Sequence, residues 1–534
     1  MIRDPIREGL AAGWRVVDAS TLERDLALET DVAIVGTGAG GGVTAEILAA
    51  AGLDVVLIEE GPLRSSTDFR MVEAEAYPQL YHESAARKTR DKAITILQGR
   101  CVGGSTTVNW TSSFRTPPST LAYWRSALGL PGLAPETLAP WFERMEARLS
   151  IAPWTVAPNE NNDALRRGAA KLGIPTGTIR RNVTNCWDLG YCGMGCPVNA
   201  KQSMLVTTLP AALARGARLV CLARAERLRL ARGRAEALEC TALDARGVWP
   251  TGRRISIRAR HYVLAAGAIG SPALLLRSLA PDPHRNLGRR TFLHPTVISA
   301  AVMPQTVRGF AGAPQTIYSD HFLETVPVDG PIGFKLEAPP LHPVLFGMTM
   351  QGFGAPHAEL MRQFPDAQVL IALLRDGFNP GSPGGQVGLR GDGSPVLAYP
   401  LNPFVWDGVR RALLAMAEIQ FAAGARRVLP VHERATPYAS WSEARSAIAA
   451  LPLEPLLTRI VSAHVMGGCA MARDPRDGVV DAEGRHFQLE NLSVHDGSVF
   501  PTSLGANPQL SIYGLVARNA STLAARLAPA AAGA

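Results

Sequence analysis

The sequence predicts an α/β fold that binds a dinucleotide, because a strand, a glycine turn, a helix and an acidic residue follow one another within residues 31–61. The apolar run Asp31–Val35 has the length and composition of a buried strand. A turn with the spacing G-x-G-x-x-G follows it, formed by Gly36, Gly38 and Gly41. A second apolar run, 54–58, leads to Glu59. The agreement of these features favours a bound dinucleotide over an ordinary strand-to-helix turn.

Each part of this segment has a physical role in holding a dinucleotide. The glycines permit a tight turn, close approach of the backbone to a pyrophosphate, and close packing of helix on strand. The helix that follows presents its first N–H groups and its positive dipole end to the phosphates. Glu59 lies 21 residues after Gly38, a spacing that places a carboxylate on a ribose hydroxyl.

Composition indicates a globular protein with large hydrophobic cores and excludes several functional classes. Hydrophobic residues make up 47% of the 534 residues and charged residues 19%, which allows two to four domains. The net charge is +8, but the basic residues are scattered, so no nucleic-acid partner is expected. The sequence contains no run of about 18 apolar residues, so no integral membrane span is expected.

A second glycine-rich segment, QGRCVGGSTTVNWTSSFR at 98–115, has the composition of a ligand-binding loop. Gly103 and Gly104 stand beside a cluster of short polar side chains that includes Ser105 and Asn109. Glycine lets a backbone approach a ligand closely, and the hydroxyl and amide groups offer hydrogen bonds. Taken alone, the segment is equally well explained as an ordinary polar loop.

Two later segments are further candidates for parts of a binding or catalytic site. Residues 261–278, HYVLAAGAIGSPALLLRS, have the pattern of a buried strand, a turn of small residues and a helix. This is either a second turn against the same cofactor or a plain strand–helix unit. The C-terminal region contains His464 in AHVMGGC, then Asp496–Gly497, and Asn507 in GANP. A lone histidine is more often structural than catalytic, and the glycine-rich setting is what favours a site role for His464.

In this order, the segments resemble the glucose–methanol–choline (GMC) oxidoreductase family of flavoproteins over nearly the whole chain. GRCVGGSTTVN and GAIGSPALLLRS are similar to its two signatures, and LGRRTFLHP at 287–295 is similar to the stretch after the second. AHVMGGC and GANP resemble the catalytic segment of cholesterol oxidases and long-chain alcohol oxidases. One departure is that the second signature usually ends in Ser-Gly, whereas Leu279 follows Ser278 here.

The resemblance implies a fold of two parts. A Rossmann-like FAD-binding domain is assembled from the discontinuous segments 1–130, 200–300 and 456–534. An α+β substrate-binding domain with an antiparallel sheet comprises 301–455 together with 131–199, which holds a cysteine-rich loop.

The resemblance also implies FAD as the cofactor, held without a covalent bond. Val108 stands where some family members carry the histidine that attaches the flavin. Ala225 is expected against the adenine through its backbone, and Asp496 and Gly497 beside the ribityl and diphosphate groups. The cofactor-binding residues implied in addition to the first glycine turn and Glu59 are Gly103, Gly104, Ser105, Asn109, Ala225, Asp496, Gly497 and Asn507.

The implied reaction is oxidation of an alcohol by hydride transfer to flavin N5, with His464 as base and Asn507 beside it. An alcohol C–H is a poor hydride donor until the hydroxyl loses its proton. A neutral imidazole can accept that proton, and an amide can stabilise the alkoxide that develops. Glu337, in an apolar stretch, either faces the cavity or is a paired or surface carboxylate, and the second interpretation is favoured.

Three of the seven cysteines, Cys186, Cys192 and Cys196, lie within NCWDLGYCGMGC. Thiolates in a glycine-rich loop can hold iron–sulfur or zinc. The loop resembles that of FAD-dependent glucose dehydrogenases, where three cysteines hold a three-iron cluster, and a [3Fe-4S] cluster here would relay electrons from the flavin. The alternative, which is favoured, is a set of buried thiols. The odd number of cysteines argues against a disulfide framework and for a reducing compartment.

The sequence therefore predicts an FAD-dependent dehydrogenase or oxidase whose substrate is a hydrophobic primary alcohol of medium or long chain. The apolar character of 300–455 favours this substrate over a sugar or a sterol, which remain alternatives within the family. Alternatives from other classes are a nicotinamide dehydrogenase and an electron-transfer subunit without its own alcohol chemistry. Oxygen, a quinone or a cytochrome would accept the electrons. The expected location is the cytoplasm, with peripheral attachment to the inner membrane left open.

Overall fold

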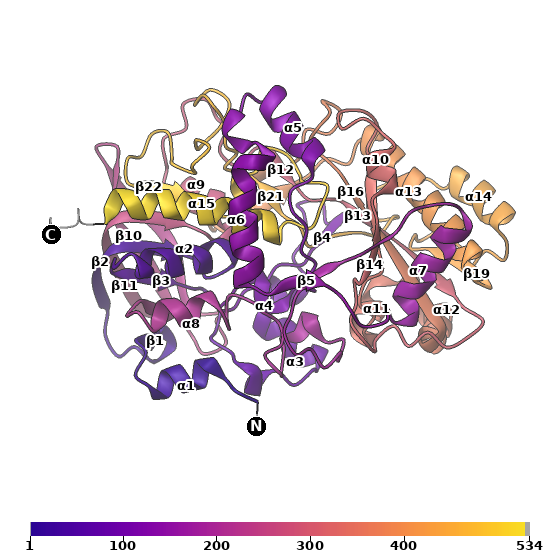
Figure 1. The fold of residues 1–534 in the computed structure, drawn as a ribbon, viewed down its shortest axis with the longest axis horizontal. Helices are drawn as coiled ribbons and strands as arrows, with labels where there is room; N and C mark the ends of the chain where they lie inside the picture. Colours follow the sequence, from indigo (N-terminus) through magenta and orange to yellow (C-terminus); the bar gives the residue numbers. More distant parts are fainter. Residues whose placement is uncertain (1, 529–534) are drawn as a thin grey trace.

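Two sheets of eight strands each lie beside one another and form the frame of the protein. The computed structural model describes residues 2–528. In Figure 1 the first sheet lies on the left and the second on the right, and the C-terminal helix α15, in yellow, runs beside the first. Strands and helices from distant parts of the sequence alternate in both units, so the α/β class predicted from the sequence is confirmed.

The first sheet has the order β1-β8-β3-β2-β11-β10-β9, with β22 beside β11. Strand β2 is parallel to β3 and to β11, so these three strands end at the same edge of the sheet. Ligands bind at that edge in open parallel sheets, and the glycine turn lies there. The strands are β1 (Val16–Asp18), β2 (Leu26–Val35), β3 (Val55–Ile58), β8 (Arg218–Cys221), β9 (Ala223–Ala231), β10 (Arg234–Leu243), β11 (Pro250–Leu264) and β22 (Leu492–Val494).

The second sheet has the order β4-β20-β13-β16-β15-β14-β6, with β19 beside β13, and all pairs except β4–β20 are antiparallel. Strands β4 and β20 come from segments predicted to belong to the FAD-binding domain, and the division into domains stays a prediction. The strands are β4 (Ile94–Ile96), β6 (Gly177–Thr178), β13 (Thr296–Val302), β14 (Ile317–Ser319), β15 (Phe334–Glu337), β16 (Ala367–Leu374), β19 (Arg427–Pro430) and β20 (Ile460–Ser462).

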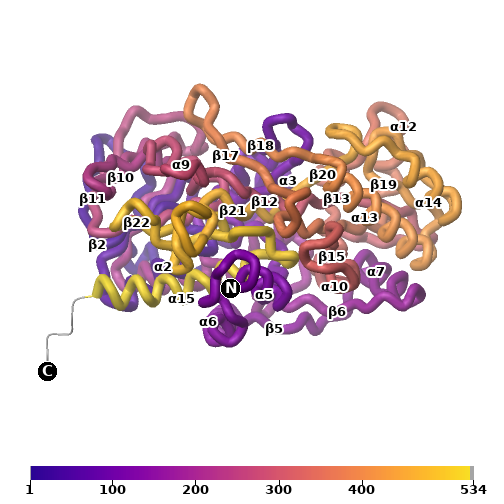
Figure 2. Tube along the Cα trace, turned by 90° about the horizontal axis from the view of Figure 1, so that it is seen from above, coloured from indigo at the N-terminus to yellow at the C-terminus, as the bar shows by residue number. Residues whose placement is uncertain are grey.

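Three two-stranded ribbons complete the strand pairing: β5 (Ile151–Pro153) with β7 (Arg180–Asn182), β12 (Thr291–Phe292) with β21 (Met466–Gly467), and β17 (Gln386–Leu389) with β18 (Pro395–Ala398). Figure 2 shows the β17–β18 ribbon above the junction of the two sheets.

Helices cover the outer faces of both sheets. In the first unit α2 packs against α15 and α8, and in the second α13 packs on β13, β16 and β19. Within residues 2–528, no helix is both long enough and apolar enough to cross a membrane. The helices are α1 (Pro5–Ala11), α2 (Ala39–Ala50), α3 (Glu73–Leu80), α4 (Ser105–Val108), α5 (Pro118–Ser126), α6 (Pro135–Arg148), α7 (Glu160–Lys171), α8 (Thr208–Leu213), α9 (Gly267–Arg277), α10 (His321–Glu324), α11 (Pro343–Thr349), α12 (Gly354–Arg362), α13 (Pro403–Ala422), α14 (Trp441–Ala450) and α15 (Gln509–Leu527).

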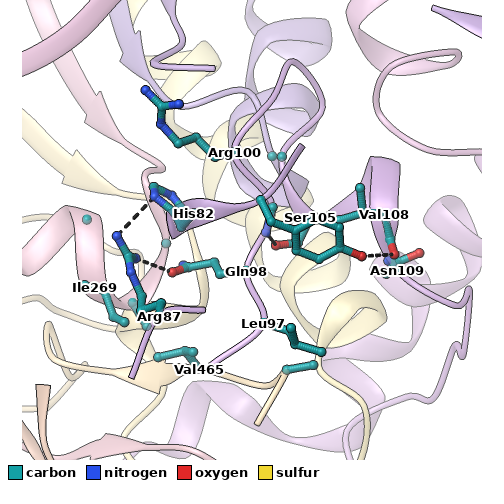
Figure 3. Close-up of a pocket in the computed structure, with 18 of the residues that line it drawn as sticks. His82, Arg87, Leu97, Gln98, Arg100, Ser105, Val108, Asn109, Ile269 and Val465 are labelled. Atoms are coloured by element: carbon teal, nitrogen blue, oxygen red, sulfur yellow. Dashed lines mark hydrogen bonds between the residues drawn. The ribbon is translucent and has the colours of Figure 1, made fainter. Parts of the chain in front are cut away.

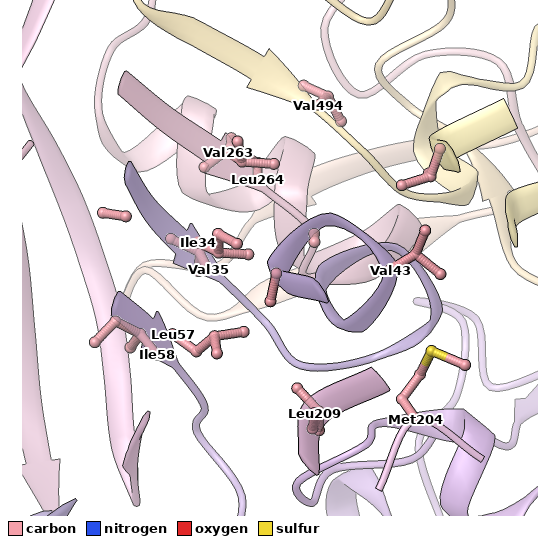
Figure 4. Packing of buried hydrophobic residues seen from close by; sticks show 14 of the residues in the cluster. Ile34, Val35, Val43, Leu57, Ile58, Met204, Leu209, Val263, Leu264 and Val494 are labelled. Carbon is pink, nitrogen blue, oxygen red and sulfur yellow. The ribbon is translucent and has the colours of Figure 1, made fainter. Parts of the chain in front are cut away.

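The core of the first unit holds the ligand edge in place. Every residue of β3 is buried, as is the end of β2, which is typical of parallel strands covered on both faces. Figure 4 shows Ile34, Leu57 and Val263 on one side of α2, with Met204 and Leu209 below the helix in this view. Because these side chains are almost fully buried, the start of α2 is rigidly positioned at the ends of the strands.

Candidate active site

A cavity of about 840 Å³ lies between the two units, and both contribute its walls. Its size falls within the range of ligand and cofactor sites. Of the residues predicted from the sequence, Gly41 and Gly103 lie outside the lining and shape the backbone instead. The predicted residues that do line it are Gly36, Gly38, Glu59, Gly104, Ser105, Asn109, Ala225, His464, Asp496, Gly497 and Asn507.

The first glycine turn presents an uncapped helix N-terminus to this cavity. Gly36 has a φ of +98°, which favours glycine. Gly38 is the N-cap of α2, and none of the described side chains caps the first amides of that helix. A Cβ at Gly40 would overlap the carbonyl oxygen of His495, so α2 packs directly on the neighbouring backbone. These free N–H groups form an anion site of the kind that holds a pyrophosphate.

The two glycine turns meet at Gly38 and Gly104. Gly104 has a φ of +53°, and a Cβ there would lie 2.7 Å from the Cα of Gly38. Replacement of Gly104 by alanine is therefore expected to push the turns apart and weaken FAD binding at least about tenfold. Titration of the apoprotein with FAD, followed by flavin fluorescence, measures this. Gly132→Ala is the matched control, because its Cβ would meet no described atom within 4 Å. Equal affinities in both variants would contradict the expectation.

Glu59 reaches the cavity from the end of β3, as predicted. Its carboxylate accepts hydrogen bonds from the Thr37 N–H at 3.1 Å, the Thr37 hydroxyl at 2.6 Å and the Gly61 N–H at 2.9 Å. Burial raises the pKa of Glu59, and these bonds oppose that effect. Glu59 thus stabilises the glycine turn as well as facing the position expected for a ribose.

The second glycine-rich segment contributes α4 and two fixed polar side chains. The Ser105 hydroxyl accepts a hydrogen bond from the Gly99 N–H at 2.9 Å, and the Asn109 amide donates one to Gln509 at 2.7 Å. Figure 3 shows Ser105 and Asn109 on one side of the cavity. Gln509 was not predicted from the sequence; it lines the cavity from the start of α15 and fixes Asn109.

A polar cluster that was not predicted from the sequence also lines the cavity. The Arg87 guanidinium donates to Gln98 Oε1 at 2.8 Å and lies 3.1 Å from His82 Nδ1, and Figure 3 shows all three side chains together. Glu83 accepts a further bond from Arg87 at 3.0 Å. His82, Glu83 and Arg87 lie in an irregular segment with no motif, and Gln98 is the first residue of the second glycine-rich segment, where its role was not foreseen.

Asp496 and Ala225 both line the cavity and have hydrogen-bond partners within the protein. Asp496 accepts hydrogen bonds from the Gly267 N–H at 2.9 Å and the Ser271 hydroxyl at 2.5 Å, which fixes the start of α9. The carbonyl of Ala225 accepts a hydrogen bond from Arg277 at 2.8 Å. Asp496 therefore acts first as a cap that holds the second turn against the cavity.

His464 and Asn507 enter the cavity from the C-terminal segment. His464 follows β20, and its Nδ1 lies 3.2 Å from Nδ1 of His294, the histidine of the LGRRTFLHP stretch. Burial lowers the pKa of His464 to about 4, so its ring is neutral at neutral pH. The Asn507 Oδ1 is buried and finds no hydrogen-bond partner within the described chain. An unpartnered acceptor at the cavity wall is a position for a ligand hydroxyl.

Glu337 is not the paired or surface carboxylate that the sequence analysis favoured. It is fully buried in β15 and lies directly opposite Ile371, a cavity-lining residue of β16, so both face the same side of the sheet. Asn507 Nδ2 lies 3.4 Å from Glu337 Oε2, which also accepts a bond from Gln315. Glu337 Oε1 has no partner in the part of the chain that is described. Burial raises the pKa of Glu337 to about 7, and Lys335 opposes the shift.

The cysteine loop packs behind the second glycine turn. Buried Lys201 joins the two, since its ammonium donates to the carbonyls of Thr107, Asn109 and Cys192 at 2.6–2.8 Å. The three thiols of the loop are free, and within residues 2–528 no group of three or more histidine, cysteine or acidic side chains is arranged to hold a metal ion. The structure therefore gives no ligand set for the [3Fe-4S] cluster.

Known proteins share both the sequence and the fold. Two family profiles described as GMC oxidoreductase match residues 77–296 and 380–515. An uncharacterised GMC-type oxidoreductase of Sinorhizobium fredii is 30% identical over 93% of this chain and 95% of its own. The chain belongs to the GMC oxidoreductase family. The resemblance inferred from the sequence motifs is thus confirmed.

Two further proteins are similar to this chain, one in sequence and one in fold. A long-chain-alcohol oxidase of Arabidopsis thaliana is 28% identical over 91% of this chain and 67% of its own length. The crystal structure of pyridoxine 4-oxidase from Mesorbium loti superposes with a TM-score of 0.67 at 20% identity, over 92% of this chain and 99% of that one. As a GMC oxidoreductase, the protein is an FAD-dependent enzyme that acts on CH–OH groups.

The residues present fit FAD. The uncapped start of α2 matches the diphosphate, Glu59 the adenosine ribose, and the space between α4 and His464 the flavin ring. Asn507, whose Oδ1 has no hydrogen-bond partner among the described residues, lines the same cavity.

Proposed function

We propose that this GMC oxidoreductase oxidises a hydrophobic primary alcohol, of medium or long chain, to the aldehyde. The single observation that supports this substrate is the apolar wall opposite the cofactor end of the cavity. A sugar site would need converging polar groups, and on this wall they are few. The apolar lining residues of this end are Ile298, Leu341, Leu345, Phe346, Met350, Val369, Ile371 and Leu373.

The FAD is proposed to be held without a covalent bond, because Val108, at the end of α4, has no nucleophilic atom. When bound, FAD supplies a hydride acceptor. The residues of the chain then have two tasks, to hold the alcohol oxygen and to receive its proton. His464 and Asn507 reach the cavity from neighbouring loops, so they are proposed to hold that oxygen between an imidazole and an amide.

The proton of the hydroxyl has two candidate acceptors. His464, neutral at neutral pH, is the base expected from the sequence. Glu337, joined to Asn507, is the second. Whichever group receives it, the buried surroundings keep water away from the reacting hydroxyl. Both residues lie within one network, so substrate binding and proton transfer depend on the same side chains.

Anaerobic flavin bleaching tests the proposed substrate. We expect dodecanol to bleach the absorbance near 450 nm, with glucose ineffective, because the long apolar chain buries against the apolar wall at about 0.8 kcal/mol per CH₂. A series of shorter alcohols should therefore bind progressively more weakly. Bleaching by glucose alone would contradict the aliphatic assignment, and bleaching by cholesterol alone would favour a sterol.

The names of the relatives support oxygen as the electron acceptor in preference to a quinone or a cytochrome, since several are oxidases. Readmission of air after bleaching should then restore the yellow colour with release of hydrogen peroxide. An electron-transfer subunit without its own chemistry would show no bleaching with any alcohol. A colourless protein that cannot be reconstituted with FAD would contradict all of these proposals.

A further inference from the structure

His294 connects the two residues that are proposed to hold the alcohol. Its ring is almost fully buried. Nδ1 lies 3.2 Å from His464 Nδ1, and Nε2 accepts a hydrogen bond of 2.9 Å from the N–H of Gly505, in the loop that carries Asn507. One imidazole thus contacts both His464 and the Asn507 loop.

The backbone of His294 is held in an unusual conformation. Its φ is +45°, in the left-handed region that is uncommon for residues other than glycine and in which histidine, asparagine and aspartate are the more frequent exceptions. Buried Asp376 fixes it, because its carboxylate accepts hydrogen bonds from the N–H groups of Leu293 at 3.0 Å and His294 at 3.1 Å. A strained conformation that the surroundings enforce is typical of functional positions. The ring of His294 is therefore positioned rather than free to turn.

The hydrogen bonds determine which nitrogen of each ring carries a proton. Burial lowers the pKa of His294 well below its usual range and that of His464 to about 4, so each ring is neutral and has one N–H. Nε2 of His294 accepts from Gly505, so the proton of His294 is on Nδ1. That N–H donates to Nδ1 of His464, which must then be bare. The proton of His464 is consequently on Nε2, the nitrogen not occupied by His294.

We propose that His294 is a positioning residue that fixes His464 as an N–H donor toward the cavity. This inference rests on the proposed alcohol oxidation and changes the role of His464 within it. Nε2–H of His464 donates to the alcohol oxygen, and the hydroxyl proton passes to the carboxylate of Glu337. The O–H bond breaks and Glu337 becomes a neutral acid. Bound FAD would supply the acceptor for the hydride of the carbinol carbon, whose bond to oxygen would become C=O.

Two observations support Glu337 as the acceptor in this arrangement. Its Oε1 has no partner among residues 2–528, so it can take a proton without breaking an existing hydrogen bond. Its Oε2 lies 3.4 Å from Nδ2 of Asn507, the second residue proposed to hold the alcohol. Buried Lys335, on the same face of β15, favours the ionised form of the carboxylate, while Asp320, which is ion-paired with Lys335 at 2.6 Å, has the opposite effect on the pKa of Glu337.

The opposite arrangement is costly. For His464 to accept a proton at Nε2, its own proton must sit on Nδ1 and point at His294 Nδ1. His294 would then have to carry its proton on Nε2, where it would face the Gly505 N–H. Two donors would oppose each other in a buried site, and one hydrogen bond would be lost.

Two isosteric substitutions of opposite polarity test the proposal. His294→Asn keeps an N–H donor near the position of Nδ1, whereas His294→Asp offers only acceptor oxygens there. Both residues tolerate a positive φ, so backbone strain is matched. We expect the Asn variant to retain flavin reduction by dodecanol within about tenfold of the native rate, and the Asp variant to lose at least about 100-fold, with the substrate dissociation constant little changed in either.

Two different results with these variants would contradict the proposed role of His294. If His464 accepted the proton at Nε2, the aspartate of His294→Asp would hold the His464 ring in the correct tautomer. The Asp variant would then reduce the flavin faster than the Asn variant. Equal losses in both variants would also overturn the proposal, because the effect would then not depend on hydrogen-bond polarity. FAD absorbance and thermal melting check that each variant folds.

A readout that does not involve turnover separates this inference from the proposed function. Long-range ¹H–¹⁵N spectra of ¹⁵N-histidine-labelled protein report which ring nitrogen carries the proton. The chain has 11 histidines, and His464→Gln identifies the signals of His464. We expect an Nε2–H tautomer in the native protein, whereas an Nδ1–H tautomer would overturn the inference. Failure of every alcohol to bleach the flavin would contradict the proposed function and the catalytic roles assigned here, while the tautomer fixed by His294 would still be decided by the spectra.

Discussion

Replacement of His464 by alanine is expected to slow reduction of the bound flavin by an alcohol about 10²–10⁴-fold. The imidazole is the cavity group that contacts His294, and loss of a positioned donor or base at the reacting oxygen has effects of this size. Anaerobic stopped-flow measurement of the 450 nm absorbance gives the rate. The flavin spectrum and melting temperature should change little, because His464 lines a cavity and not the core.

His284→Ala is the matched control for His464→Ala, since His284 is exposed and does not line the cavity. Its rate should equal that of the native protein. An unchanged rate in the His464 variant would indicate that the alcohol is held elsewhere, and would favour the electron-transfer interpretation.

Replacement of Glu337 by glutamine is expected to lower the rate of flavin reduction about 100-fold at pH 8 and to remove its pH dependence. Burial raises the pKa of Glu337 from 4.5 to about 7. A carboxylate accepts a proton only when ionised, so the native rate should rise as the pH increases through about 7 and then level off. Lys335, Gln315 and Asn507 all favour the ionised form and limit this shift.

The contribution of Glu337 to stability changes with pH in the opposite direction to the rate of flavin reduction. Between pH 4.5 and about 7 the folded protein binds a proton at Glu337 that the unfolded chain does not bind. The contribution of Glu337 to the free energy of unfolding is therefore present at low pH and is lost as the pH rises through about 7. Glu337→Gln removes this slope, whereas Glu359→Gln, at a fully exposed position, should leave both profiles unchanged. A native rate that is flat between pH 6 and 8 would contradict the role of Glu337.

The glycine turns at the cavity could be recognised from the sequence because their geometry depends on local sequence. A strand that ends in G-x-G-x-x-G and continues as a helix forms the same anion site wherever it occurs. Gly36, Gly38 and Glu59 all line the cavity, and their contact with a dinucleotide stays a prediction. His464 and Asn507, identified by resemblance to a family, also enter it.

Other residues of the site escaped prediction because their partners are distant in sequence. Gln509 fixes Asn109 across 400 positions, and Lys201 joins the cysteine loop to the second glycine turn. Glu337 was assigned to a surface or a pair, since an isolated carboxylate in an apolar stretch gives no indication of its burial. The register of β15 against β16 buries it on the same face of the sheet as Ile371, which lines the cavity.

The sequence by itself determined the family, the cofactor and the chemistry of the first turn, because short-range spacing of glycines and one acid specifies that geometry. Only the tertiary structure decided how the protons are arranged at the site. His294, His464, Glu337 and Asn507 come from four separate segments, and the protonation of each ring depends on which donor or acceptor the fold places beside it. The contacts of a neutral imidazole determine its tautomer, and those contacts exist only after the two sheets have come together.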